Sequence, residues 1–289
     1  MQPTIKIGDF NRLKVKELAR REGYGPVFGL YLEGGRLGEI LMPQKYVPEG
    51  VKPGDEVDCF VYLDQEERLV ATTEKPYAKV GDFAWLKCTW VNEYGAFLDW
   101  GVTKNLFCPF HEQKKRMEVG NSYIVHIHID GESYRLVASA KVEHYLSREP
   151  APYKPGDVVS LLVWQKTDLG FKVIIDNQYG GLIYENQIYQ YVHSGDKLKG
   201  YIAQVREDGK IDVTLQPTGR RETEDFAQTL LKWLEDNGGV CPLGDKSDAE
   251  DIKRMFQVSK KTFKKAIGAL YKRRLIVLEG EGFRLSTED

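Results

Sequence analysis

The sequence has few cysteines, and none of them is placed to share a metal. Cys59, Cys88, Cys108 and Cys241 lie far apart and form no Cys-x-x-Cys pair. This spacing argues against a disulfide framework and against a structural zinc site. We therefore expect free, buried thiols, with no bound metal and no cofactor.

Long apolar runs and a large excess of charge are also missing. No apolar run approaches the roughly 18 residues of a membrane span, and residues 1–6 lack the basic region and apolar core of a signal peptide. We expect a cytoplasmic protein that does not engage membranes. The formal net charge of −2 gives no global basic signature, so any nucleic-acid binding must come from local patches and stacking.

Motifs that carry catalysis are absent as well. The chain has no phosphate loop, no nucleophile elbow, no His-Glu-x-x-His and no paired carboxylates in a setting that suggests a nuclease. His126 and His128 alternate along one predicted strand but lack an evident third ligand. We expect them to be surface or packing residues, and we expect that the protein is not an enzyme.

One pattern occurs three times along the chain. A large residue followed by Gly leads, 15 positions later, to Pro or Tyr, and a basic residue opens a final strand near position 41. The copies run from Phe28 to Arg68, from Tyr94 to Arg135 and from Leu169 to Lys210. A repeat of about 70 residues is too long for one turn of a solenoid, so each copy is expected to be a small domain.

Each copy has the composition of short β-strands. Residues 57–63, 123–129 and 158–164 are rich in β-branched and aromatic residues. Turns such as Lys52–Asp55 and Lys154–Asp157, both Lys-Pro-Gly-Asp, precede such strands. Short strands of this number favour a small closed five-stranded barrel over a sandwich.

The repeated pattern resembles the S1-type RNA-binding domain, an OB-fold module of the bacterial ribosome, and the second copy resembles it most. In that family two aromatic rings on adjacent strands of one barrel face stack on bases. The position at +15 is commonly His, and the basic residue meets phosphate. Here Pro43 and Pro109 replace the His, and Leu169 with Lys172 replaces the aromatic pair. The resemblance implies nucleic-acid contacts from Phe28, Tyr31 and Arg68, from Tyr94, Phe97 and Arg135, and from Lys172, Tyr184 and Lys210.

The spacing of Tyr94 and Phe97 conflicts with a regular strand. Residues three positions apart face opposite sides of a sheet, so we expect Gly95 to mark a bulge that brings both rings to one face. Stacking on such a ring contributes about 1–3 kcal/mol per base and tolerates any base. The alternative is that these rings fill the barrel core. Their recurrence in two copies, with a basic residue at a matching distance in all three, favours the surface role.

After Pro217 the apolar period changes from 2 to 3.6. Residues 226–234 carry an apolar stripe that predicts a helix ending near Asn237–Gly239. Ser247–Glu250 fits a capping box for a second helix, and Ser259 is expected to cap a third over residues 260–273. Residues 275–285 then predict a β-hairpin. Three helices and a hairpin resemble a winged helix-turn-helix domain.

Positive charge marks the third helix. From Lys253 to Arg274 the chain has nine basic residues and no acidic one. A winged helix presents this helix to nucleic acid, where lysines would add salt-dependent phosphate contacts. A basic face that is merely solvated is the alternative. On a helical wheel, the polar side carries Lys261, Lys264, Lys265 and Lys272.

Three S1-type modules followed by a winged helix resemble the bacterial conserved virulence factor B family over nearly the whole chain. The expected fold is mainly β with a C-terminal α+β domain. We expect a divergent five-stranded OB-fold barrel at residues 1–75, further such barrels at 76–147 and 152–217, and a winged helix at 222–289. The resemblance implies a cytoplasmic RNA-binding protein that influences the expression of other genes, and it does not imply catalysis.

Three functions fit these features. The first is an RNA-binding regulator that holds single-stranded RNA with little sequence preference, in post-transcriptional control. The second is a DNA-binding transcription regulator that acts through the winged helix. The third is an adaptor that docks on a ribosome, polymerase or nuclease. Aromatic pairs favour the first because duplex DNA hides its base faces. Lysine in place of arginine on the third helix disfavours the second, since Arg is the commoner bidentate reader of guanine.

Overall fold

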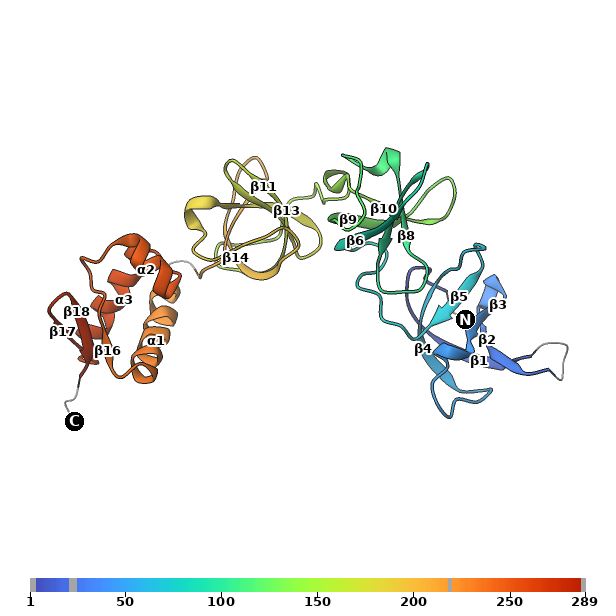
Figure 1. Ribbon diagram of the computed structural model, residues 1–289, viewed down its shortest axis with the longest axis horizontal. Coiled ribbons are helices and arrows are strands. Elements are labelled where there is room, and N and C mark those ends of the chain that lie inside the picture. Colours follow the sequence, from blue (N-terminus) through green and yellow to red (C-terminus); the bar gives the residue numbers. More distant parts are fainter. Residues whose placement is uncertain (1–3, 21–24, 218–219, 287–289) are drawn as a thin grey trace. The chain divides into compact units, whose positions relative to one another are not determined.

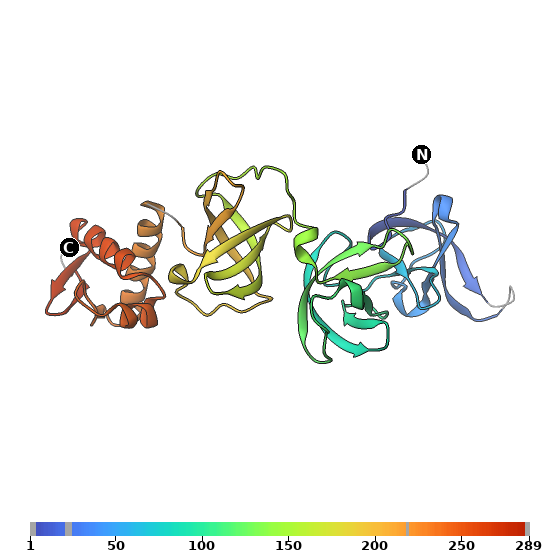
Figure 2. The same ribbon diagram turned by 90° about the horizontal axis from the view of Figure 1, so that it is seen from above.

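The computed structural model describes residues 4–20, 25–217 and 220–286 and divides the chain into two compact units. The first unit is residues 1–145 and holds two closed barrels. The second unit is residues 146–289 and holds a third closed barrel and a helical domain with a three-stranded sheet. Figures 1 and 2 show each barrel curling round on itself. The predicted fold class is confirmed.

All three barrels have five strands in the same topology. The first barrel contains β1 (Asp9–Arg20), β2 (Val27–Glu33), β3 (Glu39–Pro43), β4 (Glu56–Leu63) and β5 (Leu69–Thr72). The second contains β6 (Phe83–Val91), β7 (Gly95–Asp99), β8 (Leu106–Pro109), β9 (Ser122–Ile129) and β10 (Leu136–Ser139). The third contains β11 (Val158–Thr167), β12 (Gly170–Ile175), β13 (Tyr179–Tyr184), β14 (Lys197–Val205) and β15 (Ile211–Thr214). In each barrel the third strand pairs in parallel with the fifth, which closes the sheet.

Short 3-10 helices connect several of these strands. One follows the third strand of each barrel, and two others lie in the first barrel and after the second. Their bounds are η1 (Gly35–Leu37), η2 (Gln44–Tyr46), η3 (Phe110–Glu112), η4 (Val142–His144) and η5 (Glu185–Gln187).

The repeated glycine marks a close approach of two strands. Gly29, Gly95 and Gly170 lie directly opposite the residues 14 positions later, Pro43, Pro109 and Tyr184. A Cβ atom on these glycines would lie 2.2, 2.4 and 2.0 Å from a carbonyl oxygen of the neighbouring strand. Any side chain there would push the second and third strands apart. The glycine is therefore a requirement of the barrel, and it is the same in all three.

The bulge predicted at Gly95 is wrong. Gly95 pairs in regular register with Pro109, and the irregularity lies in the neighbouring strand β6, between Cys88 and Trp90. Tyr94 precedes β7 and belongs to the turn, so strand alternation does not govern where its ring points.

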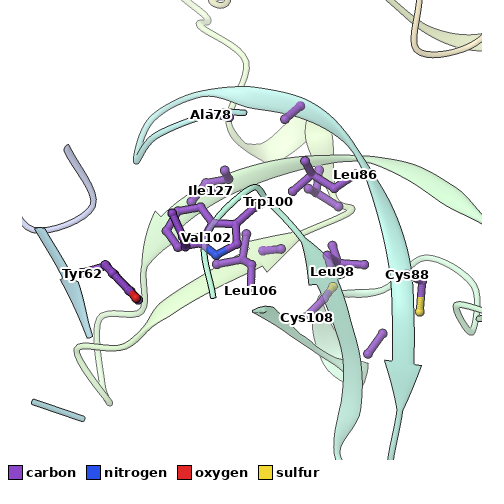
Figure 3. Packing of buried hydrophobic residues seen from close by; sticks show 14 of the residues in the cluster. Tyr62, Ala78, Leu86, Cys88, Leu98, Trp100, Val102, Leu106, Cys108 and Ile127 are labelled. Carbon is purple, nitrogen blue, oxygen red and sulfur yellow. The ribbon is translucent and has the colours of Figure 1, made fainter. Parts of the chain in front are cut away.

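The two barrels of the first unit share one hydrophobic core. Phe60, Tyr62 and Val70 of the first barrel pack in the same buried cluster as the interior of the second, including Trp100 (Figure 3). The rings of Phe60 and Trp100 meet edge to face with centroids 5.6 Å apart, and the two residues are 0% and 2% exposed. Such a pair contributes about 0.5–1.5 kcal/mol beyond the burial of its area. The first barrel also has a separate core of its own.

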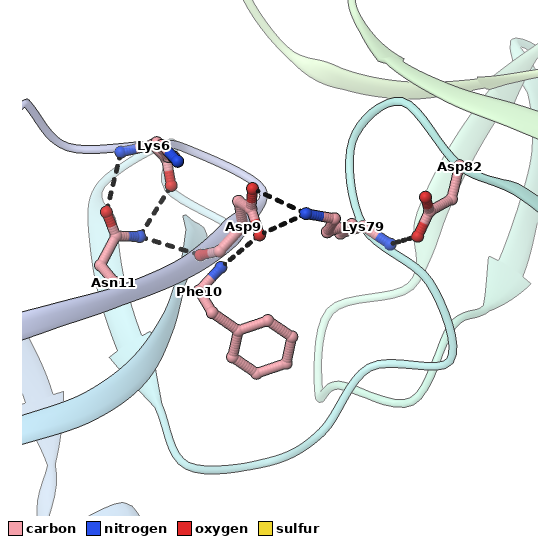
Figure 4. A network of polar contacts seen from close by, with 6 residues as sticks. All are labelled: Lys6, Asp9, Phe10, Asn11, Lys79 and Asp82. Carbon is pink, nitrogen blue, oxygen red and sulfur yellow. Dashed lines mark hydrogen bonds and ion pairs between the residues drawn. The ribbon is translucent and has the colours of Figure 1, made fainter.

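Polar contacts reinforce this junction. Lys79, just before β6, donates from Nζ to both carboxylate oxygens of Asp9 on β1, at 3.0 and 3.1 Å (Figure 4). Its backbone N–H donates to Asp82 Oδ2 at 3.0 Å, which orders the turn that enters β6. The N–H of Val80 also donates to the carbonyl of Gly8 at 2.9 Å. The first strands of the two barrels are thereby joined by hydrogen bonds as well as by the core.

The C-terminal domain contains α1 (Arg220–Asp236), β16 (Val240–Cys241), α2 (Ala249–Phe256), α3 (Lys260–Lys272), β17 (Ile276–Glu279) and β18 (Gly282–Leu285). The predicted hairpin is β17 and β18, and β16 adds a third strand against β18. Two residues are too short to produce a periodic pattern, so β16 had no sequence signal.

One of the two predicted helix caps forms, and the other does not. Ser259 caps α3 as predicted, because its side chain accepts from the N–H of Thr262 at 3.0 Å. The predicted capping box at Ser247 does not form. Asp248 is the N-cap of α2 and accepts from the N–H of Glu250 at 2.8 Å, while the Ser247 hydroxyl accepts from Gly244. Asp is an equally good N-cap, and here it stands one residue closer to the helix.

The four cysteines are free and buried, as predicted. Among the residues that the structure describes, no helix is both long and apolar enough to cross a membrane.

His126 and His128 are packing residues in the second barrel. His126 is 9% exposed, and its ring stacks on Tyr145 with centroids 4.1 Å apart and packs against Phe83 at 4.8 Å. The hydroxyl of Tyr145 lies 3.2 Å from His128 Nε2. Burial, together with the neighbouring His128, lowers the pKa of His126 to about 4. Burial also lowers the pKa of His128.

This histidine makes the stability of the second barrel depend on pH. Between pH 6.5 and about 4, the unfolded chain binds a proton at residue 126 that the folded barrel excludes. The contribution of His126 to the free energy of unfolding is therefore highest above pH 6.5. It decreases by about 2–3 kcal/mol as the pH falls toward 4. Urea unfolding of the full chain at pH 7 and pH 5 checks this. His126→Phe keeps the stack without a proton site, so it should lose less stability over this interval. Equal losses in both proteins would contradict the assignment.

Candidate nucleic-acid interface

A groove in the first unit brings predicted residues of the second barrel together. Its volume is about 730 Å³, and Tyr94, Phe97 and Arg135 all line it. The first barrel contributes the turn between β4 and β5, including Gln65 and Glu67. The junction between the barrels therefore fixes one wall of the groove against the other.

A row of three aromatic rings crosses the strands at this groove. Phe97 on β7 pairs across the sheet with Trp90 on β6 and with Phe107 on β8. The ring centroids lie 4.7 Å apart between Trp90 and Phe97, and 5.1 Å apart between Phe97 and Phe107. Trp90 is 55% exposed, far more than a core residue. The row presents aromatic surface on which bases can stack.

Trp90 and Phe107 were not predicted as site residues, although the sequence held a signal for one of them. Leu106 and Cys108 are buried and Phe107 is not, so alternation along β8 turns Phe107 toward the outer face. Trp90 had no such signal, because the irregularity between Cys88 and Trp90 shifts the register of β6. It could be placed only once the pairing of β6 with β7 was known.

Tyr94 stands beside this row on an ordered turn. The side chain of Asn92 accepts from the N–H groups of Tyr94 and Gly95 at 2.9 and 3.1 Å, which fixes the turn before β7. The ring of Tyr94 is 66% exposed. Tyr94 and Phe97 thus come from one strand and its preceding turn, and not from adjacent strands as the resemblance implied. The rings on adjacent strands are those of Trp90, Phe97 and Phe107.

Charged groups lie at the edge of the same groove. Lys104 donates from Nζ to the carbonyl of Asp64 at 2.6 Å and lies 3.3 Å from Glu67 Oε1. Arg135 Nε lies 3.4 Å from the same Glu67 oxygen. Two cations and one carboxylate therefore lie beside the aromatic row, and the carboxylate belongs to the first barrel.

The first barrel repeats the register without repeating the rings. The residues that match the row are Glu17, Tyr31 and Leu41. Tyr31 is half-buried, and so is Phe28, whose ring meets it edge to face at 6.4 Å. Arg68 is ion-paired within its own turn, to Asp64 at 2.8 Å and to Glu66 at 2.9 Å. The predicted residues of this copy offer one pair of rings and a neutralised cation.

The third barrel replaces the rings with polar and aliphatic groups. The matching residues are Gln165, Lys172 and Leu182, and Lys172 Nζ lies 5.1 Å from the centre of the Trp164 ring. The hydroxyl of Tyr184 accepts a hydrogen bond from Arg206.

Two acidic residues hold the cations around this site. Hydrogen bonds to Asp212 and Tyr184 raise the pKa of Arg206, and Asp212 is buried. Lys210 is ion-paired with Asp208 at 2.7 Å. Tyr184 is therefore ordered by an ion pair of half-buried Arg206 with buried Asp212, while Lys172 lies beside a tryptophan.

Helix α3 separates its apolar and basic sides. Phe263, Ala266, Ile267 and Leu270 are buried in the domain core. The four predicted lysines, Lys261, Lys264, Lys265 and Lys272, are exposed. Within the described part of the chain, none of these four is ion-paired. This face can therefore offer its full charge to a polyanion.

Comparison with known families matches both ends of the chain. Residues 7–74 match the S1 domain. Residues 228–285 match the CvfB-like winged helix domain. Conserved virulence factor B of Staphylococcus epidermidis is 26% identical over 259 residues, covering 86% of this chain and 87% of that protein. The resemblance to the conserved virulence factor B family is confirmed.

Two further proteins are similar over most of the chain. The uncharacterized protein YitL of Bacillus subtilis is 26% identical over 252 residues, which is 85% of this chain and 84% of that protein. A crystal structure of a multidomain protein with nucleic acid binding domains from Streptococcus pneumoniae is 24% identical. It covers 96% of this chain and 98% of that one, with a TM-score of 0.43. The S1 and winged-helix matches indicate nucleic-acid binding.

The aromatic row predicts which substitutions affect binding. Trp90→Ala and Tyr94→Ala should each weaken binding of a single-stranded oligonucleotide by about 1–3 kcal/mol, because each removes an exposed stacking surface. Fluorescence anisotropy measures this. Trp85→Ala is the matched control, since Trp85 is also an exposed tryptophan of β6 but does not line the groove. Equal effects of Trp85→Ala and Trp90→Ala would contradict the assignment.

Proposed function

We propose that the protein binds single-stranded RNA in the cytoplasm and acts in post-transcriptional control of gene expression, without catalysis. The observation that carries the proposal is the row formed by exposed Trp90 and half-buried Phe97 and Phe107, with exposed Tyr94 beside it. Bases of a single strand can lie on these rings, whereas a duplex keeps its base faces covered. The match of residues 7–74 to the S1 domain supports RNA as the nucleic acid.

Low sequence preference follows from the kind of contact. Every base has a π-face, so stacking on Trp90 or Tyr94 discriminates weakly between bases. The lysines of α3 add contacts to phosphate, which carry no sequence information. Both surfaces thus favour many RNA sequences over one defined site.

A second function is favoured by one observation. The lysine face of α3, which has no ion pair with any described residue, lies on the helix that a winged helix presents to duplex DNA, and this supports a DNA-binding transcription regulator. The adaptor function has less support, because Trp90 and Tyr94 are exposed and line a groove that also holds cations.

The choice between RNA and DNA can be measured directly. We expect the intact protein to bind an unstructured RNA more tightly than a single-stranded DNA or a DNA duplex of the same length at the same salt concentration. We also expect affinities for RNAs of different sequence to be similar. Anisotropy titrations with labelled oligonucleotides measure both. Tight binding confined to one duplex, with RNA left unbound, would refute the RNA proposal and support the transcription regulator.

Salt dependence separates the two binding surfaces. Replacing Lys261, Lys264 and Lys265 by Ala should lower affinity for all RNA sequences alike. It should also reduce the slope of log affinity against log salt by about 0.7 per lost single-strand contact. Trp90→Ala should lower affinity with the slope unchanged, because a base on a ring displaces no counterion. Titrations at four salt concentrations compare the two variants. An unchanged slope in the lysine variant would mean that α3 does not contact RNA.

A further inference from the structure

One carboxylate of the first barrel holds both cations of the groove. Glu67 Oε1 lies 3.4 Å from Arg135 Nε and 3.3 Å from Lys104 Nζ. Among the described residues, no other carboxylate is ion-paired with either cation. An RNA strand whose bases lie on the aromatic row must bring its phosphates to the charged edge of the same groove. The phosphates and Glu67 therefore compete for the same two positive charges.

The corresponding cations of the other two barrels are paired differently. Arg68 is held by Asp64, and Lys210 by Asp208, so each acid comes from the same turn as its cation. The turn before Arg135 also contains two acids, Asp130 and Glu132, and neither is ion-paired with Arg135 among the described residues. Asp130 lies nearest the end of the preceding strand. That carboxylate instead accepts from the N–H and the hydroxyl of Ser133 at 2.7 and 2.6 Å. Arg135 takes its partner from the neighbouring barrel.

The backbone at Glu67 is also unusual. Its φ is +61°, in the left-handed region that favours glycine. The residue before the basic position is left-handed in all three barrels, and the third barrel has Gly209 there. The turn is fixed by Asp64, whose side chain accepts from the N–H groups of Glu66 and Arg68 at 2.8 and 3.0 Å. A charged residue thus stands where glycine would relieve strain, and its side chain lines the groove.

We propose that the Glu67 carboxylate competes with backbone phosphate for Arg135 and Lys104. The groove therefore selects strands that both stack on the rings and carry negative charge. In the free protein its carboxylate neutralises Arg135 and Lys104. Binding of RNA exchanges this carboxylate for phosphate, and stacking on the rings offsets the lost ion pairs. A polyanion without bases gains no stacking, so it cannot displace Glu67 efficiently. This inference rests on the proposed function of the same groove.

The test compares two neighbouring glutamates. Glu67→Gln should tighten binding of an unstructured RNA by about three- to tenfold, since two exposed ion pairs and one repulsive charge are removed. It should also steepen the salt slope, because the displaced carboxylate of the wild type takes up a cation from solution and the variant has no such carboxylate. Glu66→Gln is the matched control. It removes the same charge one residue away, where the carboxylate pairs with Arg68, and it should change neither quantity.

Two further measurements make the result specific. In an Arg135→Gln background, Glu67→Gln should give a clearly smaller gain, because one of the two competed charges is gone. Inorganic polyphosphate, which has no bases, should bind the wild type weakly at this groove and should also gain affinity from Glu67→Gln. Thermal unfolding of each variant confirms that the first unit stays folded.

The outcomes distinguish this inference from the proposed function. If the wild type binds RNA and Glu67→Gln behaves like Glu66→Gln, the competitor role is refuted while RNA binding stands. A weaker affinity in Glu67→Gln would also refute it, because Glu67 would then contact RNA itself. If the wild type does not bind RNA but Glu67→Gln gains polyphosphate affinity through Arg135, RNA binding fails and the competitor role stands.

Discussion

The edge-to-face contact of Trp100 with Phe60 is the interaction on which the groove depends. It joins the interior of the second barrel to the outer wall of the first in one buried cluster. Because the junction is apolar and closely packed, the turn that carries Glu67 has a fixed position relative to the aromatic row. Trp100 also donates from Nε1 to the carbonyl of Lys104 at 2.7 Å, so the same residue orders one cation of the groove. A pair of barrels on a flexible linker could not hold a carboxylate against Arg135.

The three barrels have the same backbone topology and differ in the side chains on their outer surface. A glycine that permits close strand approach sets the same register in each, so three positions on neighbouring strands always form a row. The second barrel fills this row with rings, while the first and third place Tyr31 and Lys172 between polar and aliphatic neighbours. A change of side chain at these positions alters the ligand surface while the strand register stays the same. The strand register of the barrel therefore fixes which positions form the row, but it does not fix which side chains occupy them.

Much of the fold could be predicted, because its signals are local. Repeated glycines, turn motifs and a change of apolar period at Pro217 indicated three barrels and a winged helix. The candidate site was predicted less well. Tyr94, Phe97 and Arg135 were found through a repeated spacing, and the groove contains all three. Trp90 and Glu67 were missed because their places depend on contacts between distant segments. The irregularity in β6 sets where Trp90 lies, and the packing of two barrels sets which cations Glu67 meets. Neither the irregularity in β6 nor the packing of the two barrels produces a periodic pattern in the sequence.

The basic residues of the barrels and those of α3 differ in whether they have acidic partners. The basic residue that opens the last strand of each barrel already has an acidic partner, at Arg68, Arg135 and Lys210. The lysines on α3 have none among the described residues. The lysines of α3 can therefore contribute long-range attraction to a polyanion, and this attraction is screened by salt and independent of sequence. In the proposed binding mode, selection occurs at the groove, where stacking of bases on the rings offsets the loss of the Glu67 ion pairs. In this proposal, a chain with a net charge of −2 can bind a polyanion because the residues that attract phosphate differ from those that select the ligand.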